Sequence, residues 1–372
     1  MSRHRILYVI GQLERGGAEQ QLYYLLEHLK TRTTVVSLAP GGYWADPIRN
    51  LGHNVIELDR HRHFELERLK RIISIFRTLD PEIIHIFLDG ISGLYARIGA
   101  LLVNHRNVIV GERSHPSHYP KWFSIPVTLL NRKVKVIVCN SYTARQSLIQ
   151  RHTMPPNRTL VIPNGIDTVA IQQASRVNQE WPWPPSWSDK LIVGMVGHLH
   201  PEKNPESFVQ IADRISKIRP EARFVSVGDG PLRTQTYTLA QTLGLGDRIL
   251  FTGIRHDVPF LLRHMDIFVL TSRREGMPNV ILEAMAIGRP CVVSDVGDCS
   301  RLVQDGKNGY VIPPCNEQLF VERIVELLDN RQQRELMGAR ALEMIQDYSV
   351  QSMVEKYKRL YSEMLAADIS EI

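Results

Sequence analysis

Two glutamates stand eight positions apart in the stretch SRREGMPNVILEA (residues 272–284), and both are candidates for chemistry. Glu275 precedes a Gly-Met-Pro-Asn loop, and Glu283 lies one turn inside the helix that follows. The helix dipole alone favours an acidic residue near a helix start, which is a structural explanation for Glu283. A carboxylate that accepts two vicinal hydroxyls is also how proteins commonly hold a ribose. Glu275 needs a separate explanation, such as binding sugar hydroxyls or stabilising a developing positive charge.

The loop between the two glutamates has the character of an anion site, because N–H groups at a helix start suit a diphosphate. Its residues are Gly276, Met277, Pro278, Asn279 and Val280. A second candidate is HLHPEKN (198–204), in which Lys203 stands at the entrance of a helix. A cation there suits a phosphate, although a surface lysine is the commoner case.

Glycines follow several other expected strands. Gly16 and Gly17 in GGAEQ offer free N–H groups at a helix start, an explanation that we weigh equally with a plain turn. No G-x-G-x-x-G pattern follows that strand. Gly228 lies in VGDGPL, and the backbone of Ile254 and Arg255 in FTGIRHDV could meet the flat edge of a base.

These residues follow short apolar runs that alternate with amphipathic segments, which predicts buried parallel strands in a doubly wound α/β fold. The expected strands are 5–10, 33–38, 54–58, 82–87, 107–111, 135–139, 159–163, 191–197, 223–228, 248–253, 267–270, 290–295 and 309–313. The expected helices include 18–30, 65–79, 91–104, 142–151, 316–328, 331–346 and 350–366.

The strand pattern stops at RVNQEWPWPPSWSDK (176–190) and then restarts, which predicts two Rossmann-like domains. We expect an N-terminal acceptor-binding domain over 1–175, a linker over 176–190 and a donor-binding domain over 191–349. The segment 350–372 is expected to form a helix that packs back on the first domain. Ligands bind at the carboxyl ends of parallel strands, so the active site is expected in a cleft between the two domains.

Composition narrows the class of protein. The 372 residues carry a net charge of +6, divided as +9 over residues 1–185 and −3 over 186–372. A basic first half suggests an anionic partner: a nucleic acid, a membrane surface or a phosphorylated substrate. No apolar run approaches the ~20 residues of a membrane span. Four cysteines without metal-ligand spacing or disulfide density suggest a reducing, cytoplasmic location.

The second half resembles the retaining glycosyltransferases of family four, which have the GT-B fold. The matching segments run in the family's order and are VGHLHPEKN, VGDGPL, FTGIRHDV, DIFVLTSRREGMPNVILEAMAIGRPCVVSDVGD, DGKNGYVIP and VEKYKRLYSEML. The first half adds GGAEQ and VIPNGID (161–167). The two-glutamate motif, placed among these segments, is specific for this family.

The resemblance implies a role for each candidate residue. Glu283 would bind the ribose of a nucleoside diphosphate, and Glu275 would contact the transferred sugar. The amides of residues 276–280 and the charge of Lys203 would hold the diphosphate. The backbone around Ile254 and Arg255 would meet the base, and Gly16 and Gly17 would cover the phosphates from the first domain.

Two positions depart from the family pattern. His198 stands where the family usually has an arginine, and a histidine is only partly charged at neutral pH. Arg255, or the adjacent pair Arg273 and Arg274, could supply the missing charge. Many members also have a catalytic histidine after the strand that here reads NVIVG. This chain reads ERSH (112–115) there, which offers Arg113 and His115.

The implied reaction moves a hexose or N-acetylhexosamine from a nucleoside-diphosphate sugar, with UDP as the first guess, to a hydroxyl. No carboxylate nucleophile is evident, so we favour front-face attack, with the leaving phosphate taking the acceptor proton. No Asp-x-Asp motif is present, and neither a metal nor a cofactor is expected. A lipid-linked glycan acceptor would dock on the basic first domain, where segments 60–71 and 118–135 suit an anionic membrane, although amphipathic core helices explain them equally well.

Three alternatives stay open at this stage. A nucleotide-sugar epimerase of GT-B type would process donor without acceptor. A catalytically silent sugar-nucleotide-binding protein is disfavoured by the two intact glutamates but allowed by His198. Nucleic-acid binding rests on charge alone, without a recognition motif.

Overall fold

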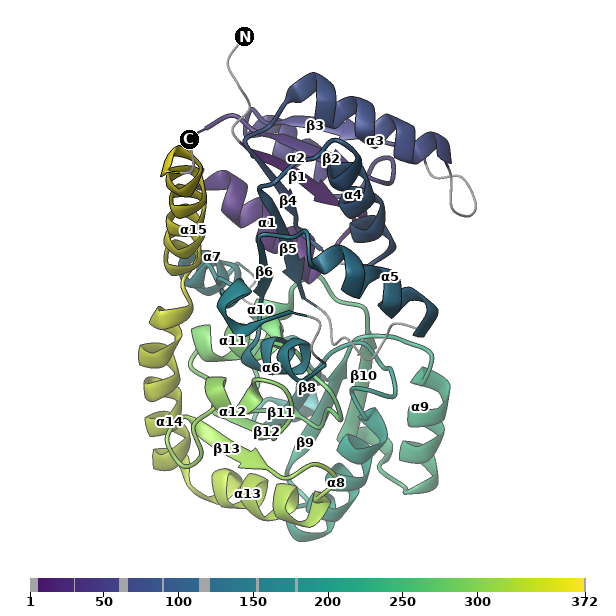
Figure 1. Ribbon diagram of the computed structural model, residues 1–372. Helices are drawn as coiled ribbons and strands as arrows, with labels where there is room; N and C mark the ends of the chain where they lie inside the picture. Colours follow the sequence, from purple (N-terminus) through teal and green to yellow (C-terminus); the bar gives the residue numbers. More distant parts are fainter. Residues whose placement is uncertain are drawn as a thin grey trace. The chain divides into compact units, whose positions relative to one another are not determined.

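The structure is a computed structural model, and it describes residues 6–29, 31–59, 66–88, 90–113, 121–151, 154–177 and 180–370. The chain forms two compact units: residues 1–165 together with 350–372, and residues 166–349. Each unit is a parallel sheet flanked by helices (Figure 1). The doubly wound α/β fold expected from the sequence is therefore confirmed.

The sheet of the first unit has the strand order β3-β2-β1-β4-β5-β6-β7, and every pairing in it is parallel. Its strands are β1 (Ile6–Ile10), β2 (Thr34–Ser37), β3 (Asn54–Glu57), β4 (Ile83–Ile86), β5 (Val108–Glu112), β6 (Val136–Cys139) and β7 (Thr159–Val161). Its helices are α1 (Gly17–Glu27), α2 (Ala45–Asn50), α3 (Leu66–Leu79), α4 (Ile91–Leu102), α5 (Lys121–Asn131), α6 (Tyr142–Gln150) and α15 (Val350–Ser370). The strand order reverses between β1 and β4, which makes their carboxyl ends the expected ligand position.

The sheet of the second unit has the order β10-β9-β8-β11-β12-β13, again with parallel pairings. Its strands are β8 (Ile192–Val196), β9 (Arg223–Val227), β10 (Ile249–Gly253), β11 (Ile267–Leu270), β12 (Cys291–Ser294) and β13 (Gly309–Ile312). Its helices are α7 (Thr168–Ala174), α8 (Pro205–Ile218), α9 (Arg233–Thr242), α10 (Val258–Arg263), α11 (Asn279–Ala286), α12 (Cys299–Leu302), α13 (Glu317–Asp329) and α14 (Arg331–Met344). Here the order reverses between β8 and β11.

The proline-rich segment before β8 packs into the second unit. Trp183 and Trp187 are buried in its core, and the indole N–H of Trp183 donates to the carbonyl of His264 at 3.1 Å. Burying two indoles removes a large apolar area from water, so the segment is held firmly despite its three prolines. The structure thus gives this segment a packing role in addition to a connecting one.

Helix α15 belongs to the first unit, although it follows α14 of the second. It lies beside α1 (Figure 1), and its apolar face, which includes Val354, Tyr357 and Tyr361, is buried in the same core as β1. The Tyr361 hydroxyl meets the imidazole Nδ1 of His85 at 2.8 Å and accepts from Tyr8 at 3.2 Å. The hydrogen bonds of these buried polar groups fix the angle of the helix on the sheet.

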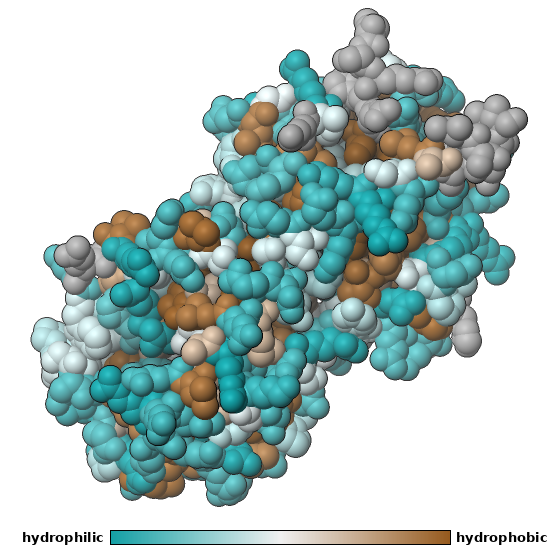
Figure 2. All heavy atoms as spheres, turned by 90° about the vertical axis from the view of Figure 1, so that its left-hand side faces the viewer, coloured by the Kyte–Doolittle hydropathy of each residue, from teal (hydrophilic) through white to brown (hydrophobic). Residues whose placement is uncertain are grey.

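On the face drawn in Figure 2, hydrophobic residues form separate patches among hydrophilic ones. Among the residues that the structure describes, no helix combines the length and the apolar character of a membrane span.

Candidate functional site

The most developed constellation lies at the point where the strand order of the second unit reverses. The loop after β8 (197–204) and the loop after β11 (271–278) leave neighbouring strands at the same edge of the sheet. Between them they carry Lys203 and Glu275. Adjacent loops diverging to opposite faces of a sheet leave a crevice, which is where open α/β sheets bind ligands.

Lys203 and Glu275 form a tight ion pair between these two loops. The ammonium of Lys203 and the hydroxyl of Ser272 each donate to Glu275 Oε1 at 2.6 Å. The Glu275 side chain is 8% exposed and that of Lys203 is 25% exposed. Within the described part of the chain, Glu275 Oε2 makes no hydrogen bond. One carboxylate oxygen is therefore fixed by the protein, and the other makes no hydrogen bond to a described residue.

The backbone holds the two loops together. The N–H of Arg273 donates to the carbonyl of Glu202 at 2.7 Å, and the hydroxyl of Thr271 donates to the carbonyl of Asn204 at 3.0 Å. Asn204 has a φ of +50°, a left-handed conformation that asparagine tolerates better than most residues. These bonds set the distance between Lys203 and Glu275 before any ligand arrives.

Gly297 packs closely against the backbone of the loop that carries Glu275. It has a φ of +58°, and a Cβ built on it would lie 2.7 Å from the carbonyl oxygen of Gly276. The next residue, Asp298, donates its N–H to that same carbonyl at 2.9 Å. We did not anticipate this residue, although a glycine directly after an expected strand, in VSDVGD, is a usable signal.

Glu283 lies on α11 and is only partly exposed. Burial raises the pKa of its carboxyl group to about 7. No cation or hydrogen-bond donor among the described residues contacts this carboxylate. A poorly solvated, unpaired carboxylate is costly in a folded protein, and such groups concentrate at functional sites. The helix-dipole explanation does not account for this burial.

The loop between the glutamates begins α11 as expected from the sequence. Met277 and Pro278 are buried, and Gly276, Asn279 and Val280 are partly exposed. The N–H groups of Gly276 and Val280 donate to no hydrogen bond within the described residues. They are therefore available to an anion at the start of the helix.

The neighbouring candidates differ in accessibility. His198 is exposed and contacts the ring of His200, with their centroids 6.1 Å apart. Ile254 is 69% exposed. The guanidinium of Arg255 forms two hydrogen bonds with Asp257, at 2.8 and 2.6 Å, so much of its charge is already neutralised.

Of the three arginines considered as substitutes for the family arginine, Arg273 and Arg274 remain exposed, and neither side chain has a partner in the described residues. Gly228 has a φ of +131°, and a Cβ there would collide with the carbonyl of Gly197. The close approach of two strand-end loops explains this glycine without a ligand.

In the first unit, Gly16 and Gly17 are exposed at the start of α1, after β1. Glu19 folds back against them, because a Cβ on Gly16 would clash with its carboxylate. The carboxylate is buried, and burial raises the pKa of Glu19. Sequence reasoning missed Glu19, although an acidic residue three positions after a helix cap is a recognisable pattern.

Arg113 follows β5 and is bonded on three sides. Its guanidinium donates to the amide oxygen of Asn164 at 2.9 Å, to the Tyr357 hydroxyl at 3.0 Å and to the carbonyl of Phe87 at 3.3 Å. It also lies 4.1 Å from the centroid of the Phe87 ring. Arg113 thus joins the carboxyl ends of β4 and β5 to α15, which gives it a structural task. His115 lies outside the described residues.

The two doubly wound units, with paired carboxylates, a lysine and helix-start amides at one switch point, define the GT-B class of glycosyltransferases. Among the described residues, no three His, Cys, Asp or Glu side chains lie where together they could hold a metal ion.

Two family models match the chain in succession: "Glycosyltransferase Family 4" over residues 15–169 and "Glycosyl transferases group 1" over residues 177–344. The chain belongs to this glycosyltransferase family, and the resemblance drawn from its motifs is confirmed.

Similar proteins act on several sugars. The chain is 27% identical over 316 residues to an Escherichia coli UDP-Gal:alpha-D-GlcNAc-diphosphoundecaprenol alpha-1,3-galactosyltransferase, covering 81% of each protein. It is 32% identical over 179 residues to alpha-D-kanosaminyltransferase of Streptomyces kanamyceticus, covering 47% of this chain and 46% of that protein. The Anabaena protein HepE, solved in complex with UDP, has the same fold, with a TM-score of 0.83 and 21% identity over 96% of this chain and all of HepE.

Proposed function

We propose that this glycosyltransferase moves a hexose or N-acetylhexosamine from a UDP-linked donor to a hydroxyl of a glycan or lipid-linked glycan, with retention of anomeric configuration. The product would belong to a cell-envelope polysaccharide or glycoconjugate. The observation that carries the proposal is the unpaired, poorly solvated carboxylate of Glu283 beside the fixed Lys203–Glu275 pair. A ribose and a sugar diphosphate would satisfy both. HepE binds UDP in its solved complex, and the E. coli relative is a galactosyltransferase acting on a GlcNAc-diphosphoundecaprenol.

Each group has a proposed task. Glu283 accepts hydrogen bonds from the ribose hydroxyls, and the exposed backbone at Ile254 and Arg255 borders the base. The amides of residues 276–280 and the ammonium of Lys203 receive the diphosphate, with His198 at its edge. Glu275 Oε2 accepts from a hydroxyl of the transferred sugar, because Oε1 is already occupied by Lys203 and Ser272.

The reaction follows from these placements. The glycosidic C–O bond to the diphosphate breaks, and the acceptor oxygen forms the new bond on the same face of the sugar. The leaving phosphate takes the acceptor proton. Lys203 and the helix-start amides stabilise the negative charge that develops on the phosphate, a kind of contribution worth roughly 10²–10³ in rate for each donor removed. We propose that no metal ion or cofactor takes part.

The direct test has two parts. UDP-, GDP- and ADP-sugars are compared for the rise in melting temperature that binding to the native state produces. The best donor is then used in a transfer assay with wild type and Glu275→Gln. We expect Glu275→Gln to retain donor binding and to lose about 10²-fold in transfer rate. Full transfer activity in Glu275→Gln would refute the role of this carboxylate. Inhibition by a chelator, reversed by a divalent cation, would refute metal independence.

The same assay also tests two alternatives, a nucleotide-sugar epimerase and a catalytically silent binding protein. A GT-B epimerase would consume the donor sugar in the absence of any acceptor. A catalytically silent protein would bind UDP-sugar but turn nothing over, and Glu275→Gln would then change neither activity nor phenotype. The intact hydrogen bonds from Lys203 and Ser272 to Glu275 favour a transferase over a catalytically silent protein. A protein that only binds a sugar nucleotide has no need to fix a carboxylate for chemistry.

We further propose a cytoplasmic protein that contacts an anionic membrane through its basic first unit. The support is the net charge of +9 over residues 1–185 and the mixture of basic and apolar residues in segments 60–71 and 118–135. Residues 60–65 and 118–120 of these segments lie outside the described residues. A flotation assay with anionic and neutral liposomes tests this contact, and absence of retention on the anionic ones would refute it.

A further inference from the structure

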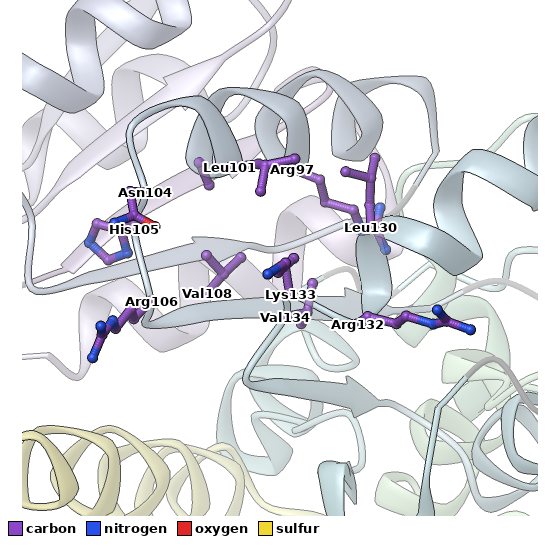
Figure 3. A pocket seen from close by; sticks show the side chains of 11 residues that line it. Arg97, Leu101, Asn104, His105, Arg106, Val108, Leu130, Arg132, Lys133 and Val134 are labelled. Carbon is purple, nitrogen blue, oxygen red and sulfur yellow. The ribbon is translucent and has the colours of Figure 1, made fainter. Parts of the chain in front are cut away.

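A cavity of about 350 Å³ lies in the first unit (Figure 3). It is formed where α4 and α5 end and where β5 and β6 begin. The lining residues are Arg97, Ala100, Leu101, Asn104, His105, Arg106, Val108, Leu130, Arg132, Lys133 and Val134. Because all strands of this sheet are parallel, the cavity is at their amino ends, whereas Gly16, Glu19 and Arg113 follow their carboxyl ends.

The cavity is cationic. Arg97, Arg106, Arg132 and Lys133 line it, and no aspartate or glutamate does. Arg106, Arg132 and Lys133 are exposed, and within the described residues none of their side chains forms an ion pair or a hydrogen bond. In Figure 3, Lys133 lies in the middle of the group beneath α4, and Arg106 and Arg132 extend to either side.

Neighbouring contacts hold this arrangement in place. Arg158 donates from Nε to the carbonyl of Lys135 at 3.2 Å and from its terminal nitrogens to the carbonyl of Arg132 at 3.4 Å. It therefore fixes the turn that carries Arg132 and Lys133. On the other side, the His105 ring is held to the carbonyl of Pro81 at 2.7 Å. The walls of the cavity are formed before a ligand binds.

Helix stability does not account for so many cations. A positive side chain near a helix C-terminus complements the helix dipole, and that explains one cation at each of the two helix ends. It does not explain why three exposed cations, Arg106, Arg132 and Lys133, line one cavity whose described lining holds no carboxylate. Like charges that line one cavity repel each other, and an anion between them removes the repulsion.

We propose that this cavity binds a phosphate group, at a site separate from the donor site. Cavities that bind small molecules have volumes of about 300–1,000 Å³, so the volume suits a phosphorylated metabolite or a lipid head group. Arginine and lysine side chains are the usual protein partners of phosphate oxygens. Leu101, Leu102 and Leu129 are exposed beside the cavity, at 43%, 54% and 56%, and would lie against the apolar part of such a ligand.

The experiment compares the wild type with the double variant Arg132→Gln/Lys133→Gln. The control, Lys356→Gln/Arg359→Gln on α15, removes two exposed cations of the same unit elsewhere. The three proteins are titrated calorimetrically with inorganic phosphate and pyrophosphate, with UDP present to occupy the donor site. They are also floated with vesicles of phosphatidylglycerol and of phosphatidylcholine. We expect the double variant to bind at least about tenfold more weakly than the wild type and the control.

The outcomes distinguish the source of the phosphate group. Binding of phosphate or pyrophosphate in solution that is lost only in the double variant supports a soluble ligand. Retention on phosphatidylglycerol vesicles that is lost only in the double variant supports a lipid head group. Equal behaviour of the double variant and the control towards all of these ligands overturns the proposal. UDP binding is expected to be the same in all three proteins, so the result is independent of the proposed donor.

Discussion

Replacing Gly297 by alanine is expected to slow sugar transfer far more than it destabilises the protein. Gly297 touches no proposed substrate group, but it lies beneath the backbone of Glu275 and Gly276. Its φ of +58° is a conformation that alanine adopts only at a cost of about 1 kcal/mol. The new methyl group would also collide with the carbonyl oxygen of Glu275, its nearest neighbour, and with that of Gly276 at 2.7 Å, where ordinary contacts begin at 3.4 Å.

The size of the effect follows from that contact. The loop must retreat by about 1 Å before the nearest atom, the Glu275 carbonyl oxygen, reaches an ordinary contact distance, and it takes Glu275 and the Gly276 amide with it. A misplacement of 1 Å costs about 10²-fold in rate, so we expect a loss of roughly 100-fold in kcat. The conformational cost of about 1 kcal/mol lowers the melting temperature by roughly 2–4 °C in a domain of this size.

Gly306→Ala is a matched control. Gly306 has a φ of +72° and lies in the same unit, but a Cβ there would meet nothing within 4 Å. It therefore carries the same backbone penalty without a clash. The assay measures kcat and KM for the best UDP-sugar together with the melting temperature of each variant. If Gly297→Ala and Gly306→Ala lose the same activity, the backbone support of Glu275 is not what matters, and the reasoning fails.

Three further predictions concern charge. Because burial raises the pKa of Glu283 to about 7, above its unfolded value, the folded state holds this proton more tightly. The stability that the proton provides is lost as the pH rises through 7, by up to roughly 3 kcal/mol. The melting temperature should therefore fall less between pH 5 and 8 in Glu283→Gln than in wild type, and equal slopes would contradict this. His198→Arg should tighten UDP binding several-fold, because arginine carries a permanent charge and a planar set of donors, and an unchanged Kd by calorimetry would count against a diphosphate at that position. Arg113→Lys should lower the free energy of unfolding by roughly 2–3 kcal/mol, because Asn164 and Tyr357 lose a charged donor. A loss of less than half of that value in a denaturant titration would show that these bonds contribute little to stability.

The sequence was sufficient for the fold because strand and helix signals agreed along most of the chain. Unbroken apolar runs such as LIVGMVG indicate strands covered on both faces, and the structure has each expected strand within two residues. Sequence reasoning set no bounds for several helices, among them α2, α5, α8 and α9. α5 (Lys121–Asn131) contains Pro126, and its basic, aromatic and apolar residues suited a membrane-contacting segment and an amphipathic core helix equally. Tertiary packing on α4 overrides that local signal.

The site was only partly accessible to sequence reasoning. The motif around Glu275 and Glu283 pointed to a nucleotide sugar, but the hydrogen bond from Lys203 to Glu275 joins two loops across 72 positions of the chain. The same limit hid Glu19, whose burial depends on the chain that packs around α1. Arg113 was predicted from its place after a strand, and that place could not show that its donors are directed at Asn164 and Tyr357.

The chain leaves the first unit after Gly165 and returns to it at Val350, and this order affects how the protein folds during its synthesis. The second unit is continuous and can fold as soon as it leaves the ribosome. The first unit must wait for α15, which completes the apolar core around Tyr8 and His85. At 5–20 residues per second, that wait lasts roughly 10–40 s. During this interval the side of its sheet that α15 later covers is open to chaperones and to other nascent chains, so ribosome-bound chains stalled before residue 350 should be the most aggregation-prone form of this protein.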